Sequence, residues 1–359
     1  LLATFKGFDN TCKTQSSLLK SMEGNNHLGE RRSEKNTSPT SAITDNNLLL
    51  KSSDSADYMW MGNHWIPPPG VPTYTPLQML EYFSKRNVLF IGDSTARRSF
   101  GTLHGLMNAT DKTNVDVLSI DAASVIDWGK HDVGNDPKCN EPGSGRVLEL
   151  PYTQCFDLPN DAASIVSTNT TIKKRANKFD MAFFPCYRYA IWRLSHNEKE
   201  VDFLSKLKAS YDLIIIGMGI WEVAQVPICA AKGLEHTSVV DRLTMVLNTI
   251  QNTSSPDLQI VFRTPGFDGA KHYEGLWEII RASKAFFANL TDRSNAAAEQ
   301  ASWGGTSSNI SLVDWGSAIA KRSHDENRIA GDNSNHYGLE ARLLFIQQLM
   351  HELAKAELQ

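Results

Sequence analysis

Short apolar segments recur along this chain, and they constrain its fold more than any other feature. Several of them are continuously apolar instead of alternating with polar residues, which is typical of strands covered on both faces of a sheet. We expect a strand in each of the six segments, which are residues 87–94, 115–121, 178–186, 211–220, 258–265 and 310–316.

Helical spacing appears in the stretches between these segments. One apolar stripe, spaced i, i+4, i+7 and i+11, begins just after Ser94, and a second lies near the end of the chain. Their members are Ala96, Phe100, Leu103 and Met107, and then Leu339, Leu343, Ile346, Met350 and Leu353. The repeated strand–helix–strand order predicts an α/β fold, a three-layer α/β/α parallel sheet, with ligands bound beyond the carboxyl ends of its strands.

The N-terminal part of the chain differs in composition from the rest. Residues 1–55 are rich in Ser, Asn, Lys and Glu and show no period, so we expect a disordered stem or linker. Aromatic residues and prolines crowd into residues 57–76, which predicts an ordered, irregular segment lying across a domain surface. A short helix is expected at residues 77–85, and the folded domain is expected to span residues 56–359.

Overall composition excludes two classes of protein. The 359 residues are 41% hydrophobic and carry a net charge of -4, which argues against a dedicated nucleic-acid binder with a basic face. The chain contains no apolar run of about 18 residues, so we expect no membrane span within it. Because it opens without Met, we expect that an upstream segment, such as a signal or membrane anchor, precedes it.

Cysteines and glycosylation sequons bear on the compartment. The five cysteines form no CxxC pair, and we expect no metal site. Cys139 and Cys155 flank a loop rich in Pro and Gly and could pair. Six N-x-S/T sequons occur, at Asn36, Asn108, Asn169, Asn252, Asn289 and Asn309. Together these features favour the lumen of the secretory pathway (the Golgi) or secretion, and a cytosolic chain with accidental sequons is the alternative.

Ser94 is the candidate nucleophile. It follows the first core strand and opens a helix, where N-terminal amides stabilise negative charge. A serine hydroxyl needs a base, and His336 lies in a polar loop after the last strand, four residues beyond Asp332. The non-catalytic alternatives are that Ser94 is a helix N-cap and that His336 is an ordinary surface histidine.

The motifs of this sequence resemble those of a known family. "VLFIGDSTARR" is similar to the first block of the SGNH (GDSL) hydrolases, and specifically of the PC-esterase branch with its trichome birefringence-like and sialate O-acetyltransferase-like members. The resemblance covers roughly residues 57–355. Its motifs are GDS-x-x-R at Gly92, Asp93, Ser94 and Arg97, then G-x-W at Gly219 and Trp221, F-R-T at Phe262, Arg263 and Thr264, and a closing Asp and His.

This resemblance implies an SGNH-like (flavodoxin-like) sheet and a catalytic apparatus. Ser94 would form an acyl-enzyme, with His336 as the general base and Asp332 as its orienter. The backbone N–H groups of Ser94 and Gly219 would help to build the oxyanion hole.

Three further residues are expected to bind substrate. Arg97 would hold the site or the substrate, and Trp221 would offer a face for stacking against a sugar. Arg263 ends a predicted strand, where a substrate clamp and a structural ion pair are equally open interpretations.

Two positions depart from the family pattern. The family spaces its last motif D-x-x-H, but the third residue before His336 is Asn333, with Asp332 one step further back. Either Asp332 or Asn333 could therefore orient the imidazole, and we favour Asp332. Related hydrolases also supply an Asn amide to the oxyanion hole, where this chain has Gly217. Losing one such donor typically lowers the rate by about 10²–10³-fold.

These features predict serine-dependent acyl transfer, with acetyl as the expected group, to the hydroxyls of a carbohydrate or glycoconjugate acceptor. No tightly bound cofactor is expected, and an acetyl donor such as acetyl-CoA would serve as co-substrate. The alternatives are a carbohydrate O-acetyl esterase and a glycan-binding module of the same fold with impaired catalysis. A nucleotide-binding α/β protein is excluded because the chain lacks a phosphate loop.

Overall fold

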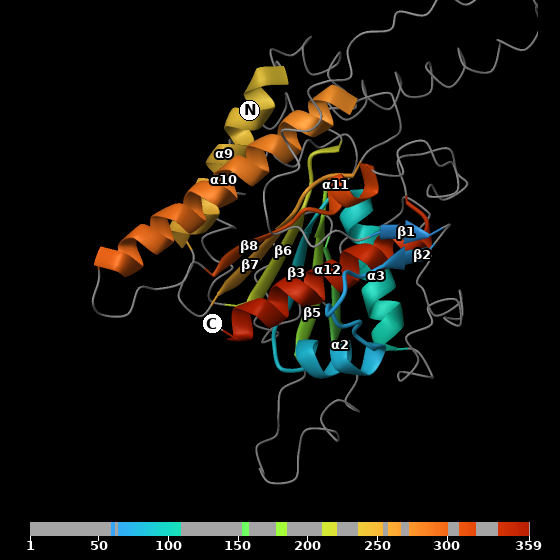
Figure 1. Cartoon of the computed structure of the whole chain (residues 1–359). Coiled ribbons are helices and arrows are strands. Elements are labelled where there is room, and N and C mark those ends of the chain that lie inside the picture. Colours follow the sequence, from blue (N-terminus) through green and yellow to red (C-terminus); the bar gives the residue numbers. More distant parts are fainter. Residues whose placement is uncertain are drawn as a thin grey trace, which may run out of the picture. The chain divides into compact units, whose positions relative to one another are not determined.

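The computed structural model provides the fold of the domain that follows the predicted stem (Figure 1). Residues 1–55 and the predicted strand at 115–121 lie outside the described residues. The structure describes residues 59–61, 64–108, 153–157, 177–184, 210–220, 236–253, 258–266, 273–300, 309–320 and 337–358.

The described residues form a mixed sheet of six strands, in the spatial order β4-β5-β3-β6-β7-β8. All neighbouring strands run parallel except β4, which pairs antiparallel with β5 at one edge. The strands are β3 (Val88–Gly92), β4 (Thr153–Asp157), β5 (Lys178–Phe183), β6 (Leu213–Gly217), β7 (Gln259–Arg263) and β8 (Ile310–Val313). The α/β prediction is confirmed, and the antiparallel edge strand β4 is an addition to it.

The order of the parallel strands creates a switch point. Taken in chain order, β5, β3, β6, β7 and β8 lie in the sequence 2-1-3-4-5, which is the order of flavodoxin-like sheets. The chain first moves to one side of β3 and then crosses to its other side to form β6. In such sheets the ligand crevice opens between these two strands at their carboxyl ends. The residues directly after Gly92 and Gly217 therefore flank the expected crevice.

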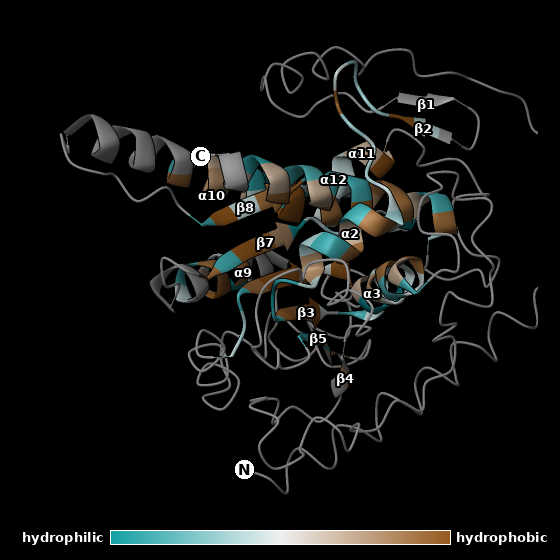
Figure 2. Ribbon diagram, turned by 90° about the horizontal axis from the view of Figure 1, so that it is seen from below, coloured by the Kyte–Doolittle hydropathy of each residue, from teal (hydrophilic) through white to brown (hydrophobic). Residues whose placement is uncertain are grey.

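Both faces of the sheet are covered by helices, which explains the continuously apolar strands (Figures 1 and 2). Along β3, Leu89 and Ile91 belong to one buried cluster, whereas Val88 and Phe90 belong to the other. Helices α9 (His236–Thr253) and α10 (Tyr273–Gln300) cover the first face. The second face is covered by α2 (Pro76–Phe83), α3 (Ser94–Met107), α11 (Trp315–Ala320) and α12 (Leu339–Leu358).

The two predicted apolar stripes face this second cluster. Every member of the stripes on α3 and α12 is buried there except Leu339, which packs against the cluster while partly exposed. Among the described helices, none combines the length and the apolar character needed to cross a membrane.

The aromatic and proline-rich segment contains more regular structure than predicted. It begins with a short antiparallel hairpin of β1 (Met59–Met61) and β2 (His64–Ile66), in which Trp60 pairs with Trp65. The segment then leads into α2, which begins with a capping box: the Thr75 side chain accepts from the Gln78 backbone N–H, and the Gln78 side chain accepts from Thr75 N–H. Pro76 at the first helical position suits this start.

Cys155 forms a disulfide from the edge strand β4 and is 1% exposed. Its partner lies outside the described residues, so the pairing with Cys139 stays a prediction. The bond ties a short edge strand with few apolar residues to another part of the chain.

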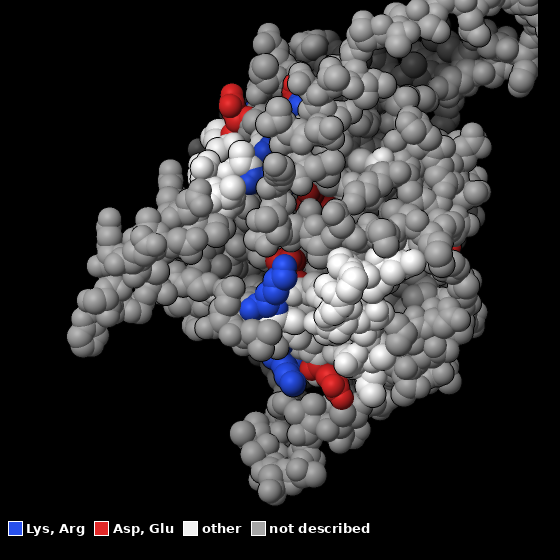
Figure 3. Space-filling view, viewed as in Figure 1, with Lys and Arg blue, Asp and Glu red and all other residues white. Residues whose placement is uncertain are grey.

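Charged side chains of the described residues lie in small groups of both signs on the face shown in Figure 3. Two ion pairs illustrate the local balance. Lys355 and Glu352 pair at 2.8 Å within α12, and Lys284 of α10 pairs with Asp314 at 2.8 Å. The second pair lies beside the carboxyl edge of the sheet, where β8 ends.

Candidate active site

Asp93, not Ser94, caps the helix that follows β3. The Asp93 Oδ1 atom accepts hydrogen bonds from the backbone N–H groups of Thr95 (2.9 Å) and Ala96 (3.3 Å) and from the Thr95 hydroxyl (2.6 Å). Ser94 is thus the first residue inside α3. The N-cap interpretation of Ser94 is therefore wrong, because its neighbour already satisfies the exposed amides.

The Ser94 hydroxyl is buried and has no hydrogen-bond partner among the described residues. The residue is 8% exposed, and its Oγ atom makes no hydrogen bond with any described residue. The second carboxylate oxygen of Asp93, Oδ2, is likewise buried and unpartnered in the described part of the chain. Buried polar atoms nearly always have a partner, and exceptions point to a functional role or an ordered water.

Two glycines bring the backbones of β3 and β6 close together beside Ser94. Gly92 and Gly217 are register partners, and Asp93 N donates to Gly217 O at 3.2 Å. A Cβ on Gly92 would overlap Gly217 O and would lie 2.7 Å from the Ala96 Cβ. Only glycine fits at position 92, and the turn carrying Ser94 therefore begins directly against β6.

Gly219 lies two residues beyond β6, on the far side of the switch point from Ser94. Its φ of 122° is a conformation that favours glycine, and a Cβ there would lie 3.3 Å from Ile279 Cδ1. Both predicted oxyanion-hole residues thus follow the carboxyl ends of the two neighbouring strands that flank the crevice.

Arg263 is turned into the protein, where it is 1% exposed. One guanidinium nitrogen donates to Thr95 Oγ1 (2.6 Å), and the other donates to Ser99 Oγ (3.0 Å) and Thr95 O (3.4 Å). Burial lowers the pKa of Arg263 to about 10, an effect opposed by Asp93 and Tyr337, so the side chain stays charged at neutral pH. This placement favours the structural interpretation of Arg263 over the substrate clamp, although its main partners are hydroxyl groups rather than a carboxylate.

Arg97 is also buried, at 3% exposure. Its backbone N–H donates to Asp93 O at 3.0 Å, and its guanidinium lies 4.4 Å from the ring centroid of Phe183, at the end of β5. The residue therefore joins α3 to the strand on the other side of β3. The role of Arg97 in holding the site or the substrate stays a prediction.

Three predicted site residues, Trp221, Asp332 and His336, lie outside the described residues. The described chain resumes at Tyr337, the residue that follows His336. Tyr337 is 2% exposed, and its ring packs edge-on against Trp315 with the centroids 4.8 Å apart. A Cβ on Gly266, just past β7, would overlap the Tyr337 hydroxyl. Tyr337 therefore lies at the carboxyl edge of the sheet, the edge that also carries Ser94.

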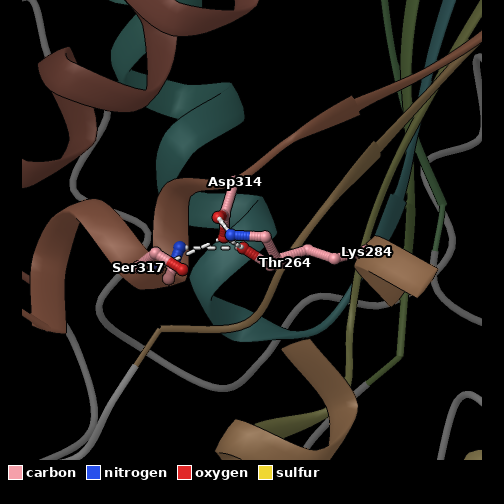
Figure 4. Close-up of polar contacts among 5 residues, drawn as sticks. Thr264, Lys284, Asp314 and Ser317 are labelled. Atoms are coloured by element: carbon pink, nitrogen blue, oxygen red, sulfur yellow. Dashed lines mark hydrogen bonds and ion pairs between the residues drawn. The ribbon is translucent and has the colours of Figure 1, made fainter. Parts of the chain in front are cut away.

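Asp314 is a polar residue at this edge that sequence reasoning did not single out. Figure 4 shows Thr264, Lys284 and Ser317 converging on its carboxylate, which pairs with Lys284 Nζ at 2.8 Å and accepts from Thr264 Oγ1 at 3.3 Å. Ser317 N donates to the same carboxylate at 3.4 Å, and Thr264 Oγ1 accepts from Gly316 N at 2.8 Å. Asp314 thus joins β7, α10 and the start of α11. The signal for it was an Asp directly after an apolar strand, in "LVDWG".

No group of three or more His, Cys, Asp or Glu side chains within the described ranges could hold a metal ion. Comparison of the chain with protein-family models, with curated proteins and with solved structures finds no match. The chemistry of the site must therefore be argued from its own residues. Those residues are a hydroxyl at a helix N-terminus, glycines at a switch point and a buried guanidinium beneath them.

Proposed function

We propose that this chain is a serine-dependent acyltransferase that moves an acetyl group to glycan hydroxyls. In this proposal it belongs to the PC-esterase branch of the SGNH hydrolases, with Ser94 as nucleophile, His336 as general base and Asp332 as the orienter of His336. A carbohydrate O-acetyl esterase with the same residues is the nearest alternative.

The Ser94 hydroxyl is the observation that carries the proposal. It lies at the switch point of the sheet and at the N-terminus of a 14-residue helix, and it has neither a capping role nor a hydrogen-bond partner among the described residues. Such a hydroxyl can give its proton to a base without first breaking another hydrogen bond. The helix N-terminus beside it favours the negative charge that develops in acyl transfer.

The base is proposed to come from the loop that precedes α12. Support comes from Tyr337, which is covalently bonded to His336 and is buried at the same edge of the sheet as Ser94. Within that loop, Asp332 is the proposed orienter, and Asn333 is its competitor.

The reaction consists of two balanced steps. Ser94 Oγ attacks the acyl carbon of the donor while His336 takes the hydroxyl proton, and the backbone N–H groups of Ser94 and Gly219 bind the oxyanion. Collapse of this intermediate expels the leaving group, which receives the proton from His336, and leaves the acyl group on Ser94. A sugar hydroxyl then attacks the acyl-enzyme and gives its proton to His336, and His336 passes this proton to Ser94 Oγ as the acylated sugar leaves. In an esterase, water replaces the sugar.

Covalent labelling tests the nucleophile. A fluorophosphonate probe should label the wild-type protein and should not label Ser94→Ala. Thr102→Ala is a matched control, because the Thr102 hydroxyl lies further along α3 and donates to Arg98 O at 2.9 Å. Equal labelling of wild type and Ser94→Ala, or no labelling of either, would reject the enzymatic proposal and favour a glycan-binding module.

Product analysis separates the two enzymatic outcomes. The protein is incubated with an acetyl ester reporter or with acetyl-CoA, with and without candidate polysaccharides. Acetyl mass added to the glycan identifies a transferase, whereas release of acetate alone identifies an esterase.

We also propose that the chain matures in the secretory pathway. Support comes from the Cys155 disulfide, since such bonds are typical of oxidising compartments, and from two exposed sequon residues, Asn108 and Asn289. Treatment of the protein from its native source with a peptide:N-glycosidase should lower its apparent mass. An unchanged mass and a free Cys155 thiol would contradict this location.

A further inference from the structure

We propose that Arg263 is a positioning residue that fixes the turn carrying Ser94 and joins it to the chain segment that leads into α12. This inference rests on the proposed function, because it assigns a role in presenting the nucleophile to its base. Arg263 touches neither the reacting atoms nor, at 1% exposure, the crevice.

Arg263 ends β7 in the same row of the sheet as the two glycines of the switch point. Register pairs Arg263 with Gly217, and Gly217 with Gly92. A Cβ on Gly217 would lie 2.8 Å from Arg263 Nε and 2.9 Å from one terminal nitrogen. The guanidinium therefore fills the space that the missing side chain of Gly217 leaves. This is the position at which the family that the sequence resembles supplies an Asn.

From this space the guanidinium holds the first turn of α3. It donates to Thr95 Oγ1 at 2.6 Å, and that hydroxyl donates in turn to Asp93 Oδ1 at 2.6 Å. A second bond reaches Ser99 Oγ at 3.0 Å, one helical turn further along. Thr95 and Asp93 are the two residues bonded to Ser94. The charged hydrogen bonds thus fix the backbone on both sides of the nucleophile.

The guanidinium also contacts two aromatic side chains, one at the start of α11 and one in α12. Its central carbon lies 4.4 Å from the ring centroid of Trp315 and 5.1 Å from that of Phe345 in α12. Trp315 packs edge-on against Tyr337 and donates from Nε1 to Ala341 O at 2.8 Å. One buried side chain therefore touches both the nucleophile turn and the residues that anchor the start of α12.

Core stability alone does not account for an arginine at this position. A buried charge is costly to desolvate, and apolar residues of similar volume are often neutral or better for stability. The planar guanidinium group of an arginine can bind two hydroxyls and stack on an aromatic ring at the same time, which an apolar side chain cannot do. Orientation of the Ser94 turn explains the choice of residue.

Two pairs of variants test this role in the full chain, with the fluorophosphonate probe and an acetyl ester reporter as readouts. Arg263→Met keeps the volume and removes the donors, and Thr95→Val removes the hydroxyl acceptor with little change in shape. Each should lower kcat and the labelling rate by about 10²-fold with KM unchanged, because misplacement of the nucleophile affects the chemical step. Thr95→Ser restores the hydroxyl and should restore most of the rate.

Gln259→Met is the matched control. Gln259 lies at the other end of β7, where its side chain accepts a hydrogen bond from the Tyr82 hydroxyl at 3.3 Å. Its replacement should leave labelling unchanged.

The outcomes distinguish this inference from the function on which it rests. Wild-type rates in a folded Arg263→Met, or in Thr95→Val, would overturn the positioning role and leave Ser94 as the nucleophile. Absence of Ser94-dependent labelling in the wild type would overturn both proposals. If Arg263→Met fails to fold, the two Thr95 variants decide the question. A lower labelling rate in Thr95→Val that Thr95→Ser restores would support the positioning role. Equal labelling rates in Thr95→Val and the wild type would contradict it.

Discussion

The side chain of Gln347 in α12 pairs with both backbone polar groups of Tyr74. Its Oε1 accepts from Tyr74 N at 2.8 Å, and its Nε2 donates to Tyr74 O at 2.8 Å. One helical turn further on, His351 Nε2 lies 3.0 Å from Pro72 O, and its ring packs edge-on against Tyr74. These contacts fasten the aromatic and proline-rich segment to α12, the helix that begins three residues after His336 in the sequence.

Gln347→Leu should therefore detach residues 72–75 from α12. Two partly buried backbone groups lose their partners, which should lower the free energy of unfolding by about 1–3 kcal/mol. Urea denaturation measures this change, and limited proteolysis should show faster cleavage near Tyr74. Gln348→Leu, the same substitution one residue further along, is the control and should cost little. Equal effects of the two substitutions would show that the paired contacts do not fasten the segment.

Gly217→Ala should be destabilising although it adds only a methyl group. The new Cβ would lie 2.8 Å from Arg263 Nε, and the guanidinium cannot move without losing its bonds to Thr95 and Ser99. We expect a loss of about 1–3 kcal/mol, as for other overpacked sites. A double-mutant cycle with Arg263→Met checks the cause, because the cost of the alanine should shrink once the guanidinium is gone. Additive effects would contradict the proposed contact.

The sequence predicted the strands well because burial on both faces leaves a local signal. Five of the six expected segments contain a described strand, and the sixth lies outside the described residues. Strand β4 was missed because "TQCFD" mixes polar and apolar residues, as an edge strand with one neighbour can. Its antiparallel direction depends on the path of the chain, which no local pattern records.

The candidate site was predictable in part. The position of Ser94 follows from a strand that runs directly into a helix. The choice of capping residue does not, because Asp and Ser are comparable caps and only the observed backbone shows that Asp93 fills the role. The inward orientation of Arg263 depends on the absence of a side chain at Gly217, a neighbour in the sheet but distant along the chain. Contacts of this kind leave no trace in a single sequence.

Asp93→Ala should weaken the start of α3. The substitution removes the acceptor for two backbone amides and for the Thr95 hydroxyl, and the loss of such a cap typically costs about 1–2 kcal/mol. Asp93→Asn keeps a side-chain oxygen at the same place and should retain most of this stability. Thermal unfolding of the two variants checks the cap. If Asp93→Asn loses as much stability as Asp93→Ala, the charge of the carboxylate matters and the capping oxygen alone does not suffice.

His104 should make the protein less stable in mild acid. Its ring lies among Phe100, Phe156 and Phe179, with centroid distances of 6.4, 4.7 and 6.3 Å. Burial in this apolar cluster lowers the pKa of His104 from 6.5 to about 4, because it disfavours the charged imidazolium. Below pH 6.5 the unfolded chain therefore binds more protons than the folded one. The contribution of the buried, neutral His104 to stability is fully present above pH 6.5 and is lost as the pH falls towards about 4.

The size of this effect follows from the shift, which corresponds to at most about 3 kcal/mol at 1.36 kcal/mol per pH unit. Other groups also respond to acid, so the measurement is the difference between wild type and His104→Leu in urea denaturation at pH 7, 5.5 and 4.5. The leucine variant keeps the apolar packing and cannot titrate, and its stability should fall less than that of the wild type over this range. Equal losses of stability in the two proteins would show that His104 has the same pKa in the folded and unfolded states. The response to acid would then arise from other groups.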